Sequence, residues 1–507
     1  MTEPVARLTR RGEATIAARG DDGAIRQLHS LYDPWREARR ECATLPGWCP
    51  AVVVFGLGGA FIPRHILSEH PEATVVVADR DRLVLAYITE HIDLSAELRS
   101  RRLVLVTSPQ ELTTALSEAS LFTCSTEIPL FELRPWTEEP LHLNCFHEFR
   151  RTLQIFQNER EGELTTMKRF GVRWLVNTLR NSDRFVGGAT RQHLVQLFNG
   201  TTFTLLGAGP AAEQNRERGA PVVATDTILP LLEQQKIVPR VVASLDPQCW
   251  SALHFRRGVP ERSLLALDPA TPAGVSSHGS HRSVIWVGSY HPLHQLLYTW
   301  GAPFYMLPQP ARSVGEMAVL LVRSFGGKAE LLGMDGTAPG GKTYARGTWH
   351  YSLARRRSSR TTPEEQFFAS QVYPHMQPIS SVGSAAPPGL EFSTTALLQR
   401  RDHLRRLNHA PELEQAILVP LARRFDPERF WQEHLGELDR VLARLQNVDV
   451  TCIPAHALRE LLGPHGIAHL PAWHGLSRRR APADCISFLY TALERVRAFV
   501  FSSLRRY

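Results

Sequence analysis

The sequence predicts an α/β protein that ends in a helical region, and three observations point to this fold class. Two stretches, 51–106 and 203–335, alternate short apolar strands with helix-like segments, which is typical of βαβ units and parallel sheets. From residue 391 onward, apolar residues follow helical spacing to the end of the chain. With 507 residues the chain is too long for one hydrophobic core, so we expect two to four domains.

The first α/β stretch carries a glycine turn. Residues 1–50 look helical and polar, and they lead into a buried strand over 51–55. Gly56-Leu57-Gly58-Gly59 follows, and Asp79 ends the next strand, which imitates a dinucleotide or S-adenosylmethionine site. Phe61 stands where the third glycine of that pattern belongs, so the signal is weak. We expect a Rossmann-like domain without a cofactor that the sequence identifies.

Segments without a clear period separate the predicted elements. Residues 125–165 carry several prolines and many charges, which predicts a partly helical connector before a helix over 169–180. Residues 336–361 are rich in Gly, Thr and Arg and predict a loop that covers the active site as a lid. Residues 376–390 predict a linker.

The central stretch predicts six strands and one strongly amphipathic helix. The helix is expected over 314–325, where Gly326-Gly327 stops it. The strands are expected at 203–206, 222–225, 241–244, 263–267, 283–287 and 329–332.

Three domains follow from this pattern. We expect a Rossmann-like domain with its helical lead-in and connector at 1–165, a central α/β domain at 166–375 and a helical C-terminal domain at 376–507.

A second glycine turn is the strongest chemical signal. Gly207, Gly209 and Pro210 follow an apolar strand, and a glycine turn with a proline that opens a helix presents backbone N–H groups to phosphate. Asp226 and Asp246 each close one of the next two apolar runs. Because ligands of open α/β sheets bind outside the carboxyl ends of the strands, we predict a nucleotide-type ligand here.

Ser313, Asp335 and His350 accompany this turn. Each strand-end acid taken alone fits a turn or capping role equally well, but three such acids around one glycine turn favour a binding site. His350 lies in the predicted lid and fits a general base, because histidine titrates near neutral pH. The alternative for His350 is an exposed loop histidine.

Composition narrows the function classes. The net charge of +8 fits anionic small molecules or an acidic protein, whereas the arginine pairs are too dispersed for a nucleic-acid stripe. No apolar run reaches membrane-span length, so we expect no membrane and a cytoplasmic location. Histidine spacing predicts no metal site. The seven cysteines form no CxxC pair, so the sequence predicts neither a zinc ribbon nor a disulfide framework. They lie at positions 42, 49, 124, 145, 249, 452 and 485.

The motif order resembles the motility-associated factor (Maf) proteins, a family of flagellin glycosyltransferases. The resemblance rests on Gly207-Ala208-Gly209-Pro210, Ala224-Thr225-Asp226-Thr227 and Ser244-Leu245-Asp246-Pro247. It extends to Arg312-Ser313-Val314 and to the segment from Gly326 to Asp335. It covers about residues 25–350, with a fainter match in the helical tail.

The resemblance implies a Rossmann-like N-terminal domain, a central α/β domain similar to bacterial sialyltransferases, and a helical C-terminal domain. It implies transfer of pseudaminic or legionaminic acid from a CMP-sugar to Ser/Thr hydroxyls of flagellin. Gly207, Gly209 and Pro210 would then hold the nucleotide, with Asp226 and Asp246 near cytidine and ribose.

The resemblance also assigns the remaining site residues and shows two departures. Ser313 would lie in the donor pocket and Asp335 at the following strand end. Ala211 replaces the serine usual after Gly-Pro, and Thr343-Tyr344 replaces the usual Thr-His pair of the lid. Tyr344 or His350 is the candidate substitute for the missing histidine.

Two other functions stay open. The central domain also resembles the 6-hydroxymethylpterin diphosphokinases (MptE-like proteins), which use Mg-ATP on a pterin alcohol, so magnesium is a possible cofactor. A non-catalytic flagellin-binding assembly factor fits the two departures.

Overall fold

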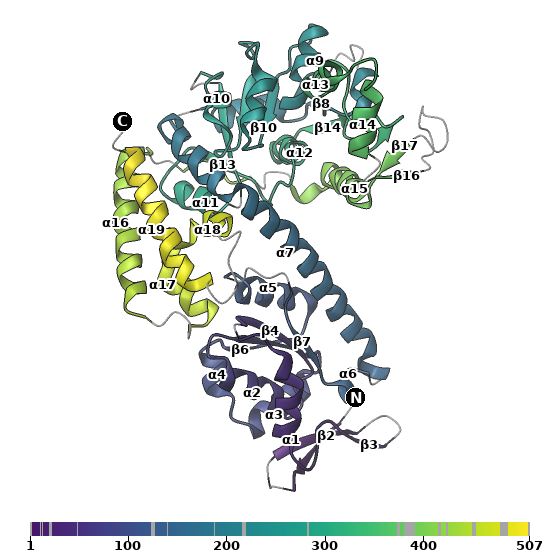
Figure 1. The fold of residues 1–507 in the computed structure, drawn as a ribbon, viewed down its shortest axis with the longest axis vertical. Helices are drawn as coiled ribbons and strands as arrows, with labels where there is room; N and C mark the ends of the chain where they lie inside the picture. The colour runs from purple at the N-terminus through teal and green to yellow at the C-terminus, as the bar shows by residue number, and fades with distance from the viewer. Residues whose placement is uncertain are drawn as a thin grey trace. The chain divides into compact units, whose positions relative to one another are not determined.

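A computed structural model gives the fold (Figure 1). It describes residues 3–10, 12, 14–19, 23–47, 49–122, 127–138, 140–186, 188–214, 220–280, 283–289, 291–372, 376–379, 391–413, 417–421, 424–448, 453–476 and 485–504. The chain divides into two compact units, one of 1–172 with 434–507 and the other of 173–433. Parallel sheets alternate with helices, so the predicted α/β class with a helical part is confirmed. The three predicted domain boundaries stay a prediction.

The first unit is built on a four-stranded parallel sheet in the order β6-β5-β4-β7. Every residue of β4 and β5 is buried, as expected where helices cover both faces of a parallel sheet. The strands are β4 (Ala51–Phe55), β5 (Thr74–Ala78), β6 (Leu103–Val106) and β7 (Leu130–Glu132). The helices are α1 (Pro34–Glu41), α2 (Phe61–Glu69), α3 (Arg82–His91), α4 (Ser95–Arg99), α5 (Pro109–Ala119) and α6 (Arg134–Thr137).

The predicted helical lead-in is wrong for the described residues before α1. An antiparallel three-stranded sheet forms there, from β1 (Glu3–Leu8), β2 (Ala14–Arg19) and β3 (Ile25–Gln27). Gly12 and Gly23 adopt positive φ angles of 78° and 75°, which turn the chain after a few residues and leave each segment too short for a helix.

The predicted connector is largely one long helix. The 42-residue α7 (Pro140–Asn181) gives its residues up to Val172 to the first unit and those from Arg173 to the second. Prolines at 135 and 140 fall in the first turn of a helix, where the missing N–H has no intrahelical partner to lose. They therefore start helices rather than mark a loop.

The helical tail predicted from periodicity is present. It comprises α16 (Pro427–Gln446), α17 (Ala455–Ile467), α18 (Leu470–Leu476) and α19 (Cys485–Leu504). Arg497 pairs with Asp439, and His434 contacts His465 and His469 through ring nitrogens at 2.6 and 2.7 Å. None of the described helices is long and apolar enough to cross a membrane.

The second unit contains a seven-stranded parallel sheet in the order β13-β12-β11-β10-β9-β8-β14. All six strands predicted for this sheet are present, and of its strands the prediction missed β13, three residues long. The strands are β8 (Thr202–Leu206), β9 (Val222–Thr225), β10 (Val241–Ser244), β11 (Leu264–Leu267), β12 (Val284–Gly288), β13 (Phe304–Met306) and β14 (Lys328–Leu332). Because β14 returns to the far side of β8, the strand order reverses beside the glycine turn that follows β8, where open α/β sheets bind ligands.

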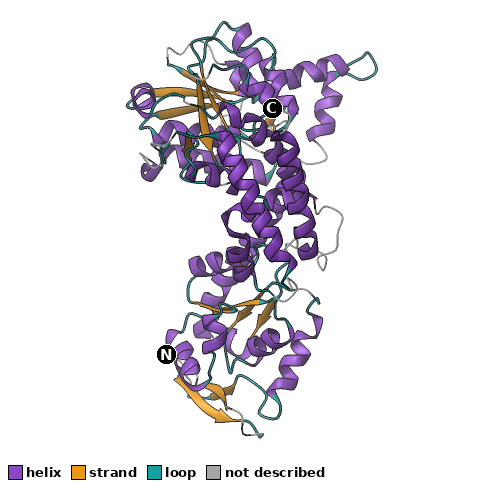
Figure 2. Cartoon of the chain, turned by 90° about the vertical axis from the view of Figure 1, so that its left-hand side faces the viewer, coloured by secondary structure: helices purple, strands orange, loops and turns teal. Residues whose placement is uncertain are grey.

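Helices cover both faces of this sheet (Figure 2). On one face, the apolar α12 (Val314–Ser324) packs with α8 (Arg191–Phe198) and α15 (Thr395–His409). On the other face lie α9 (Leu229–Gln234) and Ala345 of the predicted lid. The shorter helices α10 (Ala273–Ser276) and α11 (Pro292–Thr299) follow β11 and β12.

The predicted lid is more ordered than a loop. Within 336–361 it contains β15 (Ala338–Pro339) and all of α13 (Trp349–Arg357). The Thr348 hydroxyl caps the first turn of α13 by accepting from the Tyr351 N–H at 3.2 Å. Then come α14 (Glu364–Val372), β16 (Gln377–Ile379) and β17 (Glu391–Ser393). The rest of the predicted linker, 380–390, lies outside the described residues, as do Cys124 and Cys452.

Candidate functional site

The glycine turn after β8 packs directly against the turn after β14. The Gly207 N–H donates to the Leu332 carbonyl at 2.8 Å, and the Gly209 N–H donates to the Gly333 carbonyl at 2.9 Å. A Cβ on Gly209 would lie 2.7 Å from the Gly333 oxygen, and one on Gly207 would be closer still. Glycine is needed at both positions because the two backbones meet there and leave no room for a side chain. The N–H groups of both glycines are already hydrogen-bonded to backbone carbonyls.

Pro210 opens a short 3₁₀ helix, η3 (Pro210–Gln214), which is tied to the lid. Glu213 accepts from the Arg346 N–H at 2.5 Å and pairs with the Lys342 ammonium. The Ala345 N–H donates to the Ala208 carbonyl at 2.9 Å. The lid is therefore anchored on the glycine turn, and it brings the Lys342 ammonium to Glu213.

Asp226 lies at the carboxyl end of β9 with its side chain 2% exposed. One carboxylate oxygen accepts from the Thr227 N–H at 2.7 Å and the Thr227 hydroxyl at 3.0 Å, and the other accepts from Ser244 at 2.7 Å. Burial raises the pKa of Asp226, while these hydrogen bonds oppose the shift. The 3₁₀ helix Asp226–Ile228 begins after Thr225 and has no side-chain cap hydrogen bond, so Asp226 does not cap it; its bonds instead fix the carboxylate beside the Ser244 hydroxyl of the next strand.

Asp246 lies at the carboxyl end of β10 and shapes the segment that follows. Its carboxylate accepts from the Gln248 N–H at 2.9 Å, and its carbonyl accepts from the Ser251 hydroxyl at 3.2 Å. These bonds hold the start of η5 (Cys249–Phe255). Asp246 is partly buried and acts electrostatically on His350 and Tyr344 of the lid.

The lid brings Tyr344 and His350 together with the strand-end acids. Their rings stack with centroids 4.4 Å apart and an interplanar angle of 18°. Burial and, to a smaller extent, the nearby His254 lower the pKa of His350 to about 4, against the opposing effect of Asp226 and Asp246. The pKa of Tyr344 is raised, mainly by burial and also by the nearby Asp246 and Asp226. A neutral imidazole and a protonated phenol therefore face two carboxyl groups.

His254 is a site residue that sequence reasoning missed. Its ring lies 5.6 Å from the His350 ring, and its buried Nδ1 has no hydrogen-bond partner. Burial lowers the pKa of His254 to about 4. No sequence signal marks it, because it comes from a 3₁₀ segment that only the fold brings to the lid.

Ser313 and Asp335 are placed differently. Ser313 is the N-cap of α12, where its hydroxyl accepts from the Glu316 N–H at 3.2 Å. Met334 connects it to the turn, since its side chain approaches both Gly207 and Gly315. Asp335 follows Met334, two residues beyond the glycine that contacts Gly209. Their predicted roles in the donor pocket stay predictions.

A second polar cluster lies at the carboxyl ends of β11 and β12. Asp268 is buried, which raises its pKa to about 7, and it lies 4.0 Å from Nε2 of His294. Ser289 contacts His294 Nδ1 at 3.1 Å. Asp268 also directly follows an apolar strand. The same sequence signal that pointed to Asp226, an acid at the end of an apolar strand, could therefore have pointed to Asp268.

The C-terminal part of α7 braces these strand-end loops. Asn177 donates to the carbonyls of Pro247 and Ala270 at 2.9 and 2.8 Å. Asn181 donates to those of Pro269 and Thr271 at 2.9 and 2.7 Å. Buried amide side chains thus fix the loops after β10 and β11.

The glycine turn of the first unit is filled by side chains. The Gly59 N–H donates to Nε2 of His29 at 2.9 Å, and a Cβ on Gly58 would collide with His29. Asp79 accepts from the Trp136 indole N–H at 3.0 Å. Burial lowers the pKa of His29 to about 4 and raises that of Asp79 to about 7.

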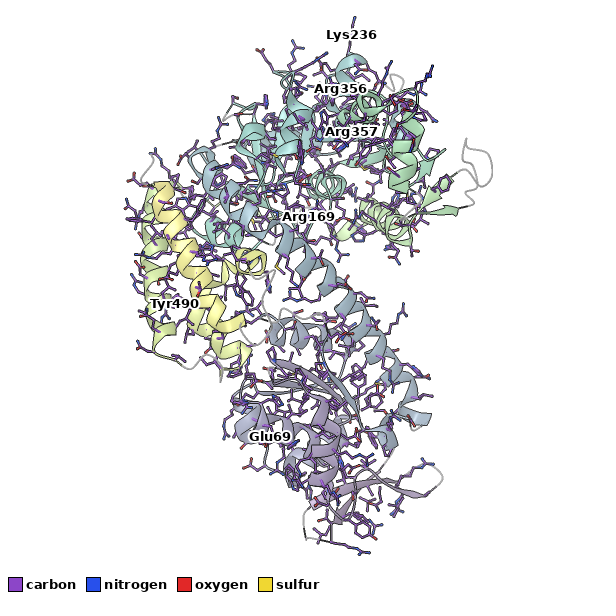
Figure 3. The ribbon with its side chains drawn as sticks, in the orientation of Figure 1. Glu69, Arg169, Lys236, Arg356, Arg357 and Tyr490 are labelled. Atoms are coloured by element: carbon purple, nitrogen blue, oxygen red, sulfur yellow. The ribbon has the colours of Figure 1, made fainter. Side chains whose placement is uncertain are left out.

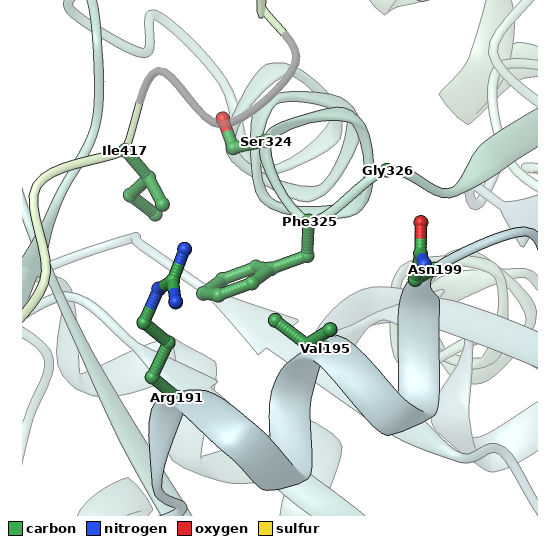
Figure 4. A pocket seen from close by; sticks show the side chains of 7 residues that line it. All are labelled: Arg191, Val195, Asn199, Ser324, Phe325, Gly326 and Ile417. Atoms are coloured by element: carbon green, nitrogen blue, oxygen red, sulfur yellow. The ribbon is translucent and has the colours of Figure 1, made fainter.

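A separate cavity of about 170 Å³ lies away from this chemistry (Figure 4). Asn199 and Gly326 precede β8 and β14, so the cavity is at the amino edge of the sheet, opposite the strand-end acids. The other lining residues are Arg191, Val195, Ser324, Phe325 and Ile417. Among the described residues, no group of three or more His, Cys, Asp or Glu is arranged to hold a metal ion.

Comparison with known proteins confirms the fold. No protein-family model matches the chain. The MAf glycosyltransferase from Magnetospirillum magneticum AMB-1 superposes with a TM-score of 0.53 over 99% of this chain and 92% of that one, at 12% identity. The chain therefore shares the fold of this glycosyltransferase. At this identity the likeness extends to the fold alone.

Two curated relatives share part of the sequence. Both are uncharacterized proteins of Treponema pallidum (strain Nichols), and each is 27% identical to this chain. One matches over 210 residues, 40% of this chain and 68% of the relative. The other matches over 222 residues, 43% of this chain and 48% of the relative, so the match spans about half of that protein.

Proposed function

We propose that this chain is a glycosyltransferase that moves a nonulosonic acid, of the pseudaminic or legionaminic type, from a CMP-sugar to Ser/Thr hydroxyls of flagellin. One observation carries the proposal. The carboxyl edge of the seven-stranded sheet gathers Asp226, Asp246, Tyr344 and His350 beside a glycine turn, in a fold shared with a MAf glycosyltransferase. Membership of the Maf family, with a central domain related to the MptE-like proteins, is part of the same proposal.

The donor would bind at the glycine turn with its phosphate toward the lid. Because Gly207 and Gly209 use their N–H groups within the protein, charge for the phosphate must come from side chains. Lys342 is the cation that Glu213 holds at the turn, and Arg346 lies nearby in the lid with its backbone N–H donating to Glu213. Guanidinium and ammonium groups bind phosphate oxygens through charge-assisted hydrogen bonds. Ser313 and Asp335 complete the proposed donor pocket.

The acceptor hydroxyl would lose its proton to His350. The hydroxyl oxygen forms a bond to the anomeric carbon, the bond from that carbon to the phosphate oxygen breaks, and its electron pair leaves with CMP. Burial lowers the pKa of His350 to about 4, so its imidazole is neutral near pH 7 but a weaker base than free histidine. In the proposed step Asp226 and Asp246, which raise this pKa, make the imidazole a better acceptor of the hydroxyl proton. The carboxyl groups of Asp226 and Asp246 stabilise the imidazolium that forms. Tyr344, stacked on the ring, orients it.

Other expectations belong to the same proposal. We place the reaction in the cytoplasm, with the nucleotide sugar and flagellin as partners, and leave magnesium as an optional cofactor. The diphosphokinase and the non-catalytic assembly factor are outcomes that the experiment below separates from transfer.

The test is transfer with purified components. The full chain is incubated with CMP-pseudaminic or CMP-legionaminic acid and unmodified flagellin, and CMP release and intact flagellin mass are measured with and without Mg²⁺. The proposal expects CMP release together with a flagellin mass increase of one or more sugar residues. An unchanged flagellin mass with both donors contradicts it. AMP formation from Mg-ATP and a pterin alcohol would identify the diphosphokinase instead.

A further inference from the structure

A row of aromatic rings, called the aromatic wall below, extends from the exposed Trp250 through Trp349 to the imidazoles of His350 and His254. Trp250 belongs to η5 and Trp349 begins α13, and their rings stack with centroids 6.2 Å apart at an angle of 24°. The Trp349 ring then contacts the rings of His350, at 5.1 Å, and His254, at 6.3 Å. Four rings from two segments thus form one continuous surface.

The outer end of this wall is open to solvent. Trp250 is 57% exposed, although tryptophan is normally well buried. The segment that carries it is held firmly, since Ser251 donates to the Asp246 carbonyl at 3.2 Å and Asn177 donates to the Pro247 carbonyl at 2.9 Å. A large, rigid, exposed aromatic surface binds with little loss of conformational freedom, as interface hot spots do.

Arginines flank the wall on both of its segments. Arg256 and Arg257 follow η5 and are exposed; Arg257 pairs with Glu233 at 3.1 Å, so Arg256 supplies the net charge on this side. Exposed arginines 355–357 end α13, and Arg356 and Arg357 are labelled in Figure 3. From Trp349 to Arg357 the helix rises about 12 Å, the length of about four extended residues. The surface therefore combines an apolar centre with a positive rim.

We propose that Trp250 and Trp349 form a platform that binds the acceptor polypeptide, through an apolar residue next to the acceptor Ser/Thr and acidic residues farther along it. This inference rests on the proposed function, because it assumes that His350 takes the acceptor proton. The ring contact between Trp349 and His350 puts the platform beside the group that must meet the acceptor hydroxyl. Its charge complements an acidic segment.

The test measures binding of fluorescein-labelled synthetic peptides to the full chain by fluorescence anisotropy, a signal that does not depend on the tryptophans being replaced. The reference peptide has a serine next to a leucine, with glutamates on both sides. A second peptide replaces the leucine with glycine, and a third replaces the glutamates with lysines. The proposal expects both changes, and Trp250→Ala, to weaken binding about tenfold, whereas Trp250→Phe restores most of the affinity.

The control is Tyr32→Ala, which removes a 63% exposed aromatic side chain from the first unit. Peptide binding by this variant should equal that of the wild type. Equal affinity of wild type and Trp250→Ala for the reference peptide would overturn the proposal. So would a loss of affinity for CMP with peptide binding intact, because the nucleobase would then occupy the platform. If flagellin is never glycosylated but the peptides bind as expected, the proposed function fails while the platform stands.

Discussion

The two parallel sheets of this chain share a sequence pattern but differ in what fills their carboxyl edges. Each has a glycine turn after its first strand and an aspartate after the next strand in the chain. In the four-stranded sheet, His29 takes the N–H of Gly59 and Trp136 donates to Asp79. In the seven-stranded sheet, Asp226 lies near Asp246, the phenol of Tyr344 and the imidazole of His350.

The difference shows that a glycine turn with a strand-end acid identifies a place in the fold, not an activity. At the first turn, the chain's own side chains use the groups that a cofactor would bind, so the aspartate has a structural role. At the second, the glycines allow two backbones to meet, and the proposed chemistry rests on the stacked lid residues Tyr344 and His350. The experiments below test this contrast.

The largest difference in transfer rate is expected between two variants in which the histidine at one or the other turn is replaced by asparagine. His350→Asn should lower the rate of transfer about 10²–10⁴-fold, because the proton acceptor is removed. His29→Asn should leave the rate unchanged and lower the free energy of unfolding by about 1–3 kcal/mol, since a buried hydrogen bond to Gly59 is disturbed. Initial rates and urea unfolding of both variants measure this. Equal activity losses would remove the contrast between the two turns.

The buried acid of the first turn should make stability depend on pH. The pKa of Asp79 is about 7 in the folded state, above its ordinary value of 3.8, so between these values the unfolded chain has lost a proton that the folded chain keeps. Asp79 therefore lowers stability as pH rises from about 4 to 7, by on the order of 2–4 kcal/mol. Asp79→Asn should remove this slope and exceed wild-type stability at pH 8. Urea unfolding at pH 5 and pH 8 checks it, and parallel wild-type and variant curves would contradict it.

The glycines of the second turn should be required for steric reasons. Gly207→Ala brings a Cβ against the Gly333 carbonyl, closer than real Cβ atoms approach, so we expect a loss of about 1–3 kcal/mol in unfolding free energy. Gly274→Ala is the matched control in the same unit, because its Cβ meets only Ala252, at an ordinary 3.7 Å. Chemical denaturation compares the two, and equal stabilities would show that the two turns are not in contact.

The smallest effect is expected at the link between the lid and the turn. Lys342→Ala removes the partly exposed ion pair with Glu213, which should change stability by less than about 1 kcal/mol. The affinity for CMP should fall several-fold, because a proposed phosphate contact is lost. Titration calorimetry with CMP measures this. Unchanged affinity would exclude Lys342 from the donor site.

The sequence was most informative where strands are wholly apolar. Six strands of the second sheet were predicted nearly to the residue, since continuous Val, Leu and Ala runs have few alternatives in a parallel sheet. The N-terminal strands and α7 were not, because short polar strands and proline-rich helix starts resemble other structures locally. Asp226 and His350 could be selected from pattern, whereas His254 could not, because only tertiary packing brings η5 to the lid.

Hydrogen–deuterium exchange with and without CMP tests most directly which carboxyl edge binds the nucleotide. We expect CMP to protect backbone amides around 207–214, 226–227, 246–251 and 342–350, and to leave 56–59 and 79–82 unchanged. Protection of the first turn with no change at the second would contradict the assignment of the donor site to the seven-stranded sheet.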